Sequence, residues 1–266
     1  MAPGGEPDKD FPWWLVILVI TGLWLLYAML SDDLYAGALK SLSKGLWVTL
    51  GVAVVSYLGA CAMGLGLAVM GMSRHLLLRQ VARLYTEVMR GVPIIVLLLY
   101  VAFVLVPAVV HGVNWLAGRE VGDEVIRTRD VPLLWRAVIA LMLAYSAFLA
   151  EIFRAGLQAV DKGQIEAAMA LGLTGWQRFR HVRFPQAFRL VLPPLGNDFV
   201  AMVKDSSLVA VLGVTDVAQL AKVTAAGNFR YFETYNVAAF LYLTMTITLS
   251  LALRRFEARM RSRSRA

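Results

Sequence analysis

The chain has 266 residues, of which 59% are apolar and only 17% are charged. A soluble domain of this length would be closer to half apolar and about a quarter charged, so the composition indicates an integral membrane protein. The net charge of +8 could suggest a nucleic-acid ligand, but the basic residues gather between and after apolar runs, as membrane topology requires.

The apolar runs predict the fold class. A helix of about 20 apolar residues crosses the ~30 Å hydrocarbon core, and helices are expected because lipid cannot satisfy backbone N–H and C=O groups. The sequence therefore predicts an all-α polytopic membrane protein with about six transmembrane helices, at 13–30, 46–72, 92–110, 133–153, 188–204 and 234–253. The ten apolar residues at 206–215 are too few to cross, so a short buried or re-entrant helix is expected there.

The first apolar segment differs from a secretory signal. A signal peptide begins with basic residues and has an apolar stretch of roughly 7–15 residues. Here the preceding ten residues carry three acidic side chains and one lysine, and the apolar stretch is longer, which favours a retained helix. We expect residues 1–40 to form a tail and an extra transmembrane helix, 41–255 the main transmembrane domain, and 256–266 a basic cytoplasmic tail.

The placement of positive charge predicts the topology. With six spans, both termini lie on one side together with the segments 73–91 and 154–189, and that side holds 17 of the 26 lysines and arginines. Basic loops stay in the cytoplasm. We therefore expect both termini to be cytoplasmic and the long segment 111–130 to face outward.

Small residues recur in the second span. Ala60, Gly64 and Ala68 follow one another at four-residue spacing, which is typical of closely packed membrane helices. The single cysteine, Cys61, excludes a disulfide framework within the chain. The three scattered histidines show no metal-ligand spacing.

The stretch EAAMALGLTGWQRFRHVRFP, residues 166–185, is too polar to cross a bilayer. Good helix formers up to Leu171 predict a short helix, and Gly172 is the expected stop. A capping box at 174–177 predicts a second short helix, which we expect to end before Pro185. The exposed small residues Ala167 and Ala168 favour docking in a groove of another protein; the alternative is that the block only covers the ends of the spans.

The same stretch resembles the EAA loop of permease subunits from bacterial ATP-binding cassette importers. The family pattern is EAA, three residues, Gly, nine residues and I-x-L-P, and here Val182 and Phe184 replace the isoleucine and leucine. The flanking sequences EVMRGVPIIVLLLY, AYSAFLAEIFRAGLQAVDKGQIEAA and LGNDFVAMVKDSSLVAVLGV resemble the polar amino-acid uptake branch of that family. The resemblance extends from about residue 40 to the C-terminus. It implies a cytoplasmic coupling segment at about 155–187, whose coupling residues are Gly163, Glu166, Ala167, Ala168, Gly172 and Pro185.

The resemblance also implies the partners. In that family the EAA helix docks on a cytoplasmic ATPase, and here Glu166 would reach a basic or backbone-donor site on it. The chain has no G-x-x-x-x-G-K-[ST] sequence, so ATP and Mg²⁺ are expected on the partner and no cofactor on this chain. The expected complex lies in the bacterial inner membrane and contains two ATPase subunits, a second permease, identical or homologous, and an extracytoplasmic binding protein that delivers the amino acid.

Polar residues within the spans are candidates for the substrate path, because they are costly in lipid. The fifth span is the richest, with two polar stripes in which residues recur seven positions apart. Carboxylates there could bind the ammonium of an amino acid, and the lysine, asparagine or a serine its carboxylate. The alternatives are a pair between Lys204 and Asp205, a local ion pair of Glu151 with Arg154, and simple packing of Tyr145. The candidate residues are Tyr145, Glu151, Asn197, Asp198, Lys204, Asp205 and Ser206.

Two other function classes compete with the importer permease. A secondary transporter driven by an ion gradient would often show repeated halves with broken helices, and no internal repeat is found. An intramembrane enzyme would need convergent catalytic groups, which the isolated histidines do not suggest.

Overall fold

The computed structural model describes residues 13–118 and 125–263, and within these ranges all regular structure is helical. The long helices correspond to the apolar runs, whereas short 3₁₀ and π turns (η) join or interrupt them. The elements are α1 (Trp13–Ser31), α2 (Asp33–Leu42), η1 (Ser43–Gly45), α3 (Leu46–Gly71), α4 (Leu76–Gly91), α5 (Ile94–Tyr100), η2 (Val101–Leu105), α6 (Val106–Leu116), η3 (Thr128–Asp130), α7 (Leu133–Gln158), α8 (Lys162–Ala170), α9 (Gly175–Arg178), η4 (Phe179–Arg183), α10 (Phe184–Asp205), η5 (Ser206–Leu212), α11 (Val217–Asn228) and α12 (Tyr231–Arg263).

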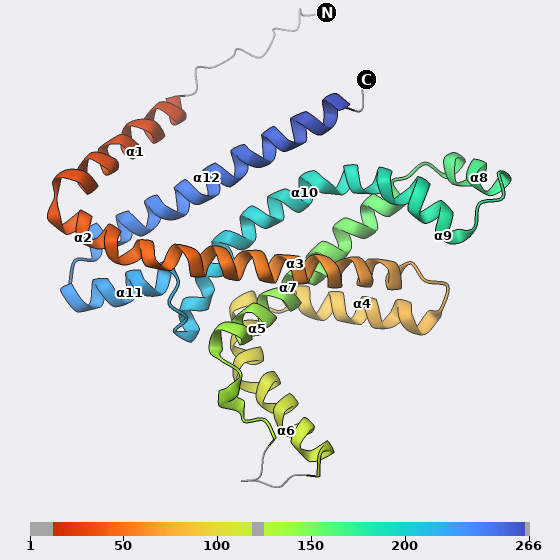
Figure 1. Cartoon of the computed structure of the whole chain (residues 1–266), viewed down its shortest axis with the longest axis horizontal. Helices are drawn as coiled ribbons and strands as arrows, with labels where there is room; N and C mark the ends of the chain where they lie inside the picture. The colour runs from red at the N-terminus through yellow and green to blue at the C-terminus, as the bar shows by residue number, and fades with distance from the viewer. Residues whose placement is uncertain (1–12, 119–124, 264–266) are drawn as a thin grey trace, which may run out of the picture.

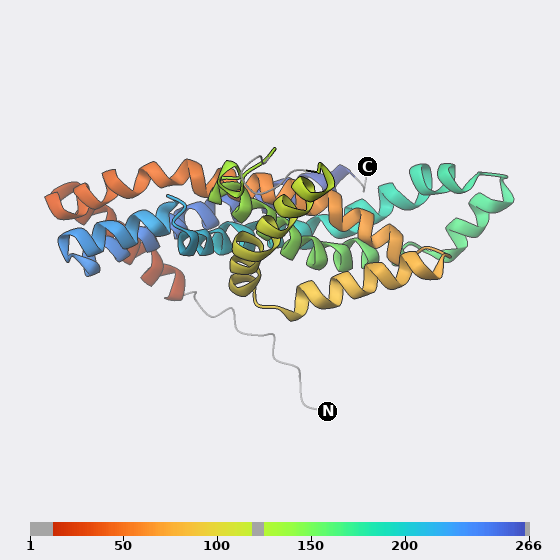
Figure 2. The ribbon, with the colours of Figure 1, turned by 90° about the horizontal axis from the view of Figure 1, so that it is seen from below.

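The long helices share one general direction. In Figure 1, α3, α10 and α12 run along the long axis of the molecule, with α7 beside them. The helices α8 and α9 lie at one end of this bundle, and α2 and α11 lie at the other. The helices α5 and α6 leave the bundle as an arm. Figure 2 shows that the bundle itself is a flattened layer.

Four helices of the described residues are long and apolar enough to cross a membrane, and a fifth span results if one bent pair counts as one. The four are Asp33–Gly71, Ile94–Leu116, Leu133–Gln158 and Tyr231–Met260. The bent pair joins Gly175–Leu212 to Val217–Asn228 at 49°. The first predicted span is the apolar helix α1, for which Val16–Ser31 gives a shorter apolar stretch. The polytopic all-α class is confirmed, and the number six stays a prediction.

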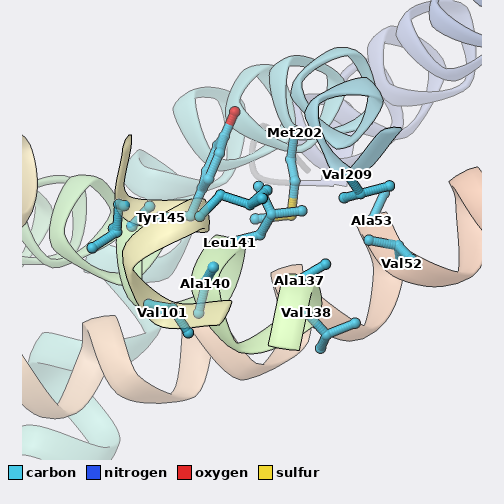
Figure 3. Close-up of a cluster of buried hydrophobic side chains, with 14 of the residues drawn as sticks. Val52, Ala53, Val101, Ala137, Val138, Ala140, Leu141, Tyr145, Met202 and Val209 are labelled. Atoms are coloured by element: carbon cyan, nitrogen blue, oxygen red, sulfur yellow. The ribbon is translucent and has the colours of Figure 1, made fainter. Parts of the chain in front are cut away.

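The core lies where α3, the α5–η2 segment, α7 and α10 meet (Figure 3). The helices α3 and α7 share the most extensive helix–helix contact of the structure. The predicted strip of small residues makes this possible, because a Cβ at Gly64 would lie 3.0 Å from the backbone nitrogen of Ala150. Ala60 and Ala68 on the same strip are buried. The prediction of close helix packing is confirmed.

The segment 73–91, which we expected to be a cytoplasmic loop, is mostly the helix α4. It packs beside both α3 and α7. Its buried side holds Ala82 and Thr86, and a second side carries an exposed apolar stripe of Leu77, Val81, Leu84 and Val88. The apolar residues of this segment recur three or four positions apart, which predicts a helix, but the arginines between them led us to expect a loop.

The arm is joined to the bundle by a buried arginine. Arg136, only 7% exposed, donates from Nη1 to the carbonyl of Ala102 at 2.8 Å and from Nε to that of Val131 at 2.9 Å, and its Nη2 donates to the carbonyl of Thr128. In the π turn η2, the N–H of Val106 bonds to Val101 instead of Ala102. The carbonyl of Ala102 thus lacks the backbone hydrogen bond that an α-helix would give it, and it accepts one from Arg136 instead.

Candidate functional site

The predicted helix–glycine–helix arrangement after α7 is confirmed. Asp161 caps α8 by accepting from the backbone N–H of Gln164 at 3.2 Å. Gly172 ends the turn with a left-handed φ of +72°, which only glycine adopts without cost. The capping box of α9 is present in both directions, since Thr174 and Gln177 each accept a hydrogen bond from the other's backbone N–H.

The second short helix does not end before Pro185, so that prediction is wrong. After α9 the chain continues through the π turn η4 directly into α10, and Pro185 lies in the first turn of α10. The π turn interrupts the α-helical hydrogen-bond series just before the proline, since the N–H of Phe184 bonds to Phe179, five residues back. The segment is thus the entry to α10 rather than a separate hairpin.

The segment from α8 to α9, which we call the coupling segment (161–178), projects from the end of the bundle (Figure 1). Gly163, Glu166 and Ala167 are exposed, whereas Ala168 is 4% exposed and packs inward. Large apolar side chains also face outward, and Leu171 is 80% exposed. The prediction that both alanines lie at the surface is therefore confirmed for Ala167 and wrong for Ala168.

The base of the coupling segment is anchored to the bundle. Leu157, Val160 and Ala187 form a small buried cluster against which Ile165 packs, and Gln186 donates a side-chain hydrogen bond to Gln164. The coupling segment is thus fixed at its base and open at its surface, as a docking element must be.

A polar cluster lies between α3, α7 and α10, among the bundle's apolar side chains. The hydroxyl of Tyr145 donates to Oδ2 of Asp205 at 2.7 Å, and that of Tyr57 donates to the carbonyl of Leu195 at 2.5 Å. Asp198 lies seven residues, about two turns, before Asp205 on the same side of α10, and its charge acts on both tyrosines. We call Tyr57, Tyr145, Asp198 and Asp205 the acidic cluster.

The other predicted residues of α10 separate into two groups. Asn197 and Lys204 are exposed on one face of the helix, seven residues apart, as the pattern predicted. Among the described residues no ion pair joins Lys204 to Asp205, whose carboxylate accepts from tyrosine instead. Ser206 is fully buried and donates to the carbonyl of Val203 at 2.8 Å, so its hydroxyl is not available to a ligand in this conformation.

Glu151 does not join the acidic cluster. It accepts from Arg154 within α7, so the predicted local ion pair is confirmed. Six residues separate it from Tyr145, which places the two side chains about 120° apart around the helix. Glu151 instead lines a pocket formed by α3, α4 and α7. Two predicted substrate-path residues of α7 therefore lie on different sides of this helix: Tyr145 faces α10, and Glu151 faces α3 and α4.

Sequence reasoning missed Tyr57 and a buried carboxylate. Asp216 is fully buried, caps α11 through the N–H of Gln219 at 2.8 Å, and accepts from the hydroxyl of Tyr242 at 3.0 Å. Gly45 allows this arrangement, because a Cβ there would collide with the backbone of Asp216 and the residue after it. The signal for Asp216 was local: an aspartate three residues before a glutamine at the start of a helix.

These features define a class of protein: a polytopic helical membrane protein with internal polar groups and an exposed helical segment at one end. Residues 60–262 match the model of the family described as "Binding-protein-dependent transport system inner membrane component". The chain belongs to this family. It is an integral permease subunit of an ATP-binding cassette importer of the inner membrane, and ATP hydrolysis resides on a separate subunit. Membership implies, in general terms, ATPase partners, a second permease and a substrate-binding protein.

Similar proteins cover most of the chain. It is 35% identical over 205 residues to the probable amino-acid permease protein YxeN of Bacillus subtilis, covering 77% of this chain and 84% of the relative. It is 34% identical over 227 residues to the glutamine transport system permease protein GlnP of Escherichia coli K12, covering 84% and 94%. A crystal structure of an amino acid ABC transporter with histidines is 37% identical with a TM-score of 0.68, covering 83% and 94%. Membership of this family excludes the alternative of a secondary transporter driven by an ion gradient.

Proposed function

We propose that this permease moves polar amino acids into the cytoplasm, in a complex with two ATPase subunits and a second permease subunit, identical or homologous. The relatives named above are described as amino-acid or glutamine permeases, which supports this cargo class. An extracytoplasmic binding protein would deliver the amino acid, and both termini would face the cytoplasm. The chain itself binds no cofactor in this proposal, and ATP and Mg²⁺ stay with the ATPase.

In this proposal the exposed coupling segment is the surface on which the ATPase docks and through which it moves the membrane helices. Glu166 and Ala167 lie on an unobstructed surface, and Gly163 in the first turn of α8 is also exposed. Ala168 supports this surface from beneath, Gly172 turns the chain, and Pro185 begins the helix that leads into the membrane. A docked ATPase would therefore push directly on α7 and α10, which flank the segment.

The test is charge reversal at the proposed contact. We expect Glu166→Lys to abolish ATP-dependent amino-acid uptake in proteoliposomes and to reduce co-purification of the ATPase, because the substituted charge would oppose the partner site. Glu257→Lys, the same change on α12, is the matched control and should retain both. Uptake at the normal rate with Glu166→Lys would contradict the docking role.

The acidic cluster and the exposed face of α10 are the proposed substrate path. Asp198 or Asp205 would attract the ammonium of the amino acid, Lys204 or Asn197 its carboxylate, and Tyr145 would hold Asp205 in position. We expect Asp198→Ala and Asn197→Ala to alter the stimulation of ATPase activity by the loaded binding protein across a panel of amino acids. An unchanged response to every amino acid would remove these residues from the path.

A further inference from the structure

The helices α1 and α12 enclose an apolar groove of about 500 Å³. The two helices are in contact near α2, where Met29 of α1 belongs to one buried cluster with Val237 and Leu241 of α12. Figures 1 and 2 show that α1 diverges from α12 toward its N-terminal end. The groove therefore occupies the angle between two helices that meet at one end and separate at the other.

The groove is open space rather than a tightly packed contact. Gly22 lies on its α1 wall, and a Cβ there would have no atom within 4 Å. The apolar side chains of Val19 and Leu26 on α1 and of Leu243 on α12 line the same groove and are each more than 40% exposed. Since membrane helices are surrounded by lipid, an acyl chain can enter this space from the side.

Two arginines of α12 lie beyond the open end of the groove. Residues 234–253 carry no charge, and Arg254 and Arg255 follow them directly. Both side chains are exposed and, within the part of the chain that the structure describes, have neither an ion pair nor a hydrogen bond. Basic residues at the end of an apolar helix are typical of the level at which lipid headgroups lie.

The register of α12 places these arginines on the side that faces the groove. Arg254 comes seven positions after Ile247 and eleven after Leu243, and both of these residues line the groove. Arg255 comes seven positions after Thr248, which also lines it. Seven and eleven positions are close to two and three helical turns, so the arginines lie above the groove, about 10 Å along the helix from its lining.

This order of apolar groove and basic end matches a phospholipid. An acyl chain gains little in the groove over bulk lipid, because both surroundings are apolar, so any selectivity has to come from the headgroup. Two guanidinium groups bind phosphate well and favour a headgroup with a net negative charge. An apolar helix of another protein would match the groove but would leave both arginines without a partner.

We propose that the groove between α1 and α12 binds one acyl chain of an anionic phospholipid, and that Arg254 and Arg255 bind the phosphate of this lipid. The helix α1 precedes residues 60–262, which match the family model, so the site uses a helix outside the matched part of the chain. A lipid bound there would contact both helices where they diverge and hold α1 against α12. The inference goes beyond the proposed function and does not depend on the cargo.

The test of the headgroup site is native mass spectrometry of the purified permease–ATPase complex, titrated with dioleoyl phosphatidylglycerol or dioleoyl phosphatidylcholine. An anionic lipid gains about fivefold in affinity from each basic residue, so we expect the double variant Arg254→Gln, Arg255→Gln to bind phosphatidylglycerol about 30-fold more weakly. The wild type should bind phosphatidylcholine, which has the same chains and no net charge, about as weakly as that. The double variant Arg74→Gln, Arg189→Gln removes the same charge at other exposed positions and should bind as the wild type does.

The test of the groove is a substitution that fills it. We expect Gly22→Phe to weaken binding of phosphatidylglycerol by about tenfold or more, because the ring would occupy the space of the acyl chain. Gly66→Phe is the matched control, since a Cβ at Gly66 of α3 also has no atom within 4 Å, and it should bind normally. The midpoint of thermal unfolding is measured for every variant, and if either groove or arginine variant fails to fold, the other still tests the site.

Unchanged binding in a folded arginine or Gly22 variant, or equal affinity for the two lipids, would overturn the inference. Competition by glycerol 3-phosphate would indicate a phosphate site that needs no acyl chain, which also contradicts it. A Gly22→Phe complex that binds lipid normally but loses one permease subunit would assign the groove to a second copy of this chain instead.

Discussion

Replacing Arg136 by methionine tests whether this buried cation holds the arm to the bundle. Hydrogen bonds to a charged group each contribute about 1.5–3 kcal/mol, and a buried carbonyl left without a donor costs about 1–3 kcal/mol. Of the three carbonyls that Arg136 binds, the one of Ala102 is buried in the π turn, whereas those of Thr128 and Val131 belong to partly exposed residues. Relief of the buried charge offsets part of the loss.

We therefore expect Arg136→Met to lower the free energy of unfolding by about 2–4 kcal/mol, with Arg136→Lys between methionine and the wild type because one ammonium reaches fewer carbonyls. At about 2–4 °C per kcal/mol, the midpoint of thermal unfolding in detergent should fall by about 5–15 °C. Arg129→Met, a change at an exposed arginine of the neighbouring turn, is the control. Equal midpoints for the two methionine variants would refute the assignment of this role to the buried guanidinium.

Three further predictions concern the bundle and the coupling segment. In a double-mutant cycle, Tyr145→Phe and Asp205→Asn should show a coupling energy of about 1–3 kcal/mol in unfolding, and additive effects would show that the 2.7 Å hydrogen bond contributes nothing. Gly64→Val should destabilise the fold by about 1–3 kcal/mol, because its Cβ would press on α7. Gly66→Val, whose Cβ would have no atom within 4 Å, should be close to neutral. Gly172→Ala should cost about 1–2 kcal/mol locally and speed proteolysis between α8 and α9, and an unchanged cleavage rate would contradict this.

The membrane helices were predictable because lipid imposes a length and a composition on each span. The helix α7 shows this well: its predicted span began at residue 133, as the helix does, and only its C-terminal end was placed too early. The error at α4 has the same origin. Its arginines and its length of 16 residues fail the test for a span, so the segment was taken as a loop, although the spacing of Leu77, Val81 and Leu84 indicates a helix with an apolar side.

The coupling segment was predictable because its structure is local. Caps and a left-handed glycine depend on residues within one turn, so the sequence of 161–178 contains the information for them. The acidic cluster is different. Tyr145 and Asp205 were both candidates, but their hydrogen bond joins residues 60 positions apart and depends on how α7 packs against α10. Tyr57 was missed because its ring suits an apolar run and only its hydroxyl is polar.

The close packing of α7 against two neighbouring helices has a mechanical consequence. This helix is held close to α3 at Gly64 and close to α10 at Gly156, where a Cβ would collide with Val191. Such close contacts resist sliding, so α7 should move together with these two neighbours when the coupling segment at its end is displaced. The acidic cluster lies between these three helices, so it should keep its geometry when they move together, whereas the pocket lined by Glu151 also has a wall from α4 and can change shape.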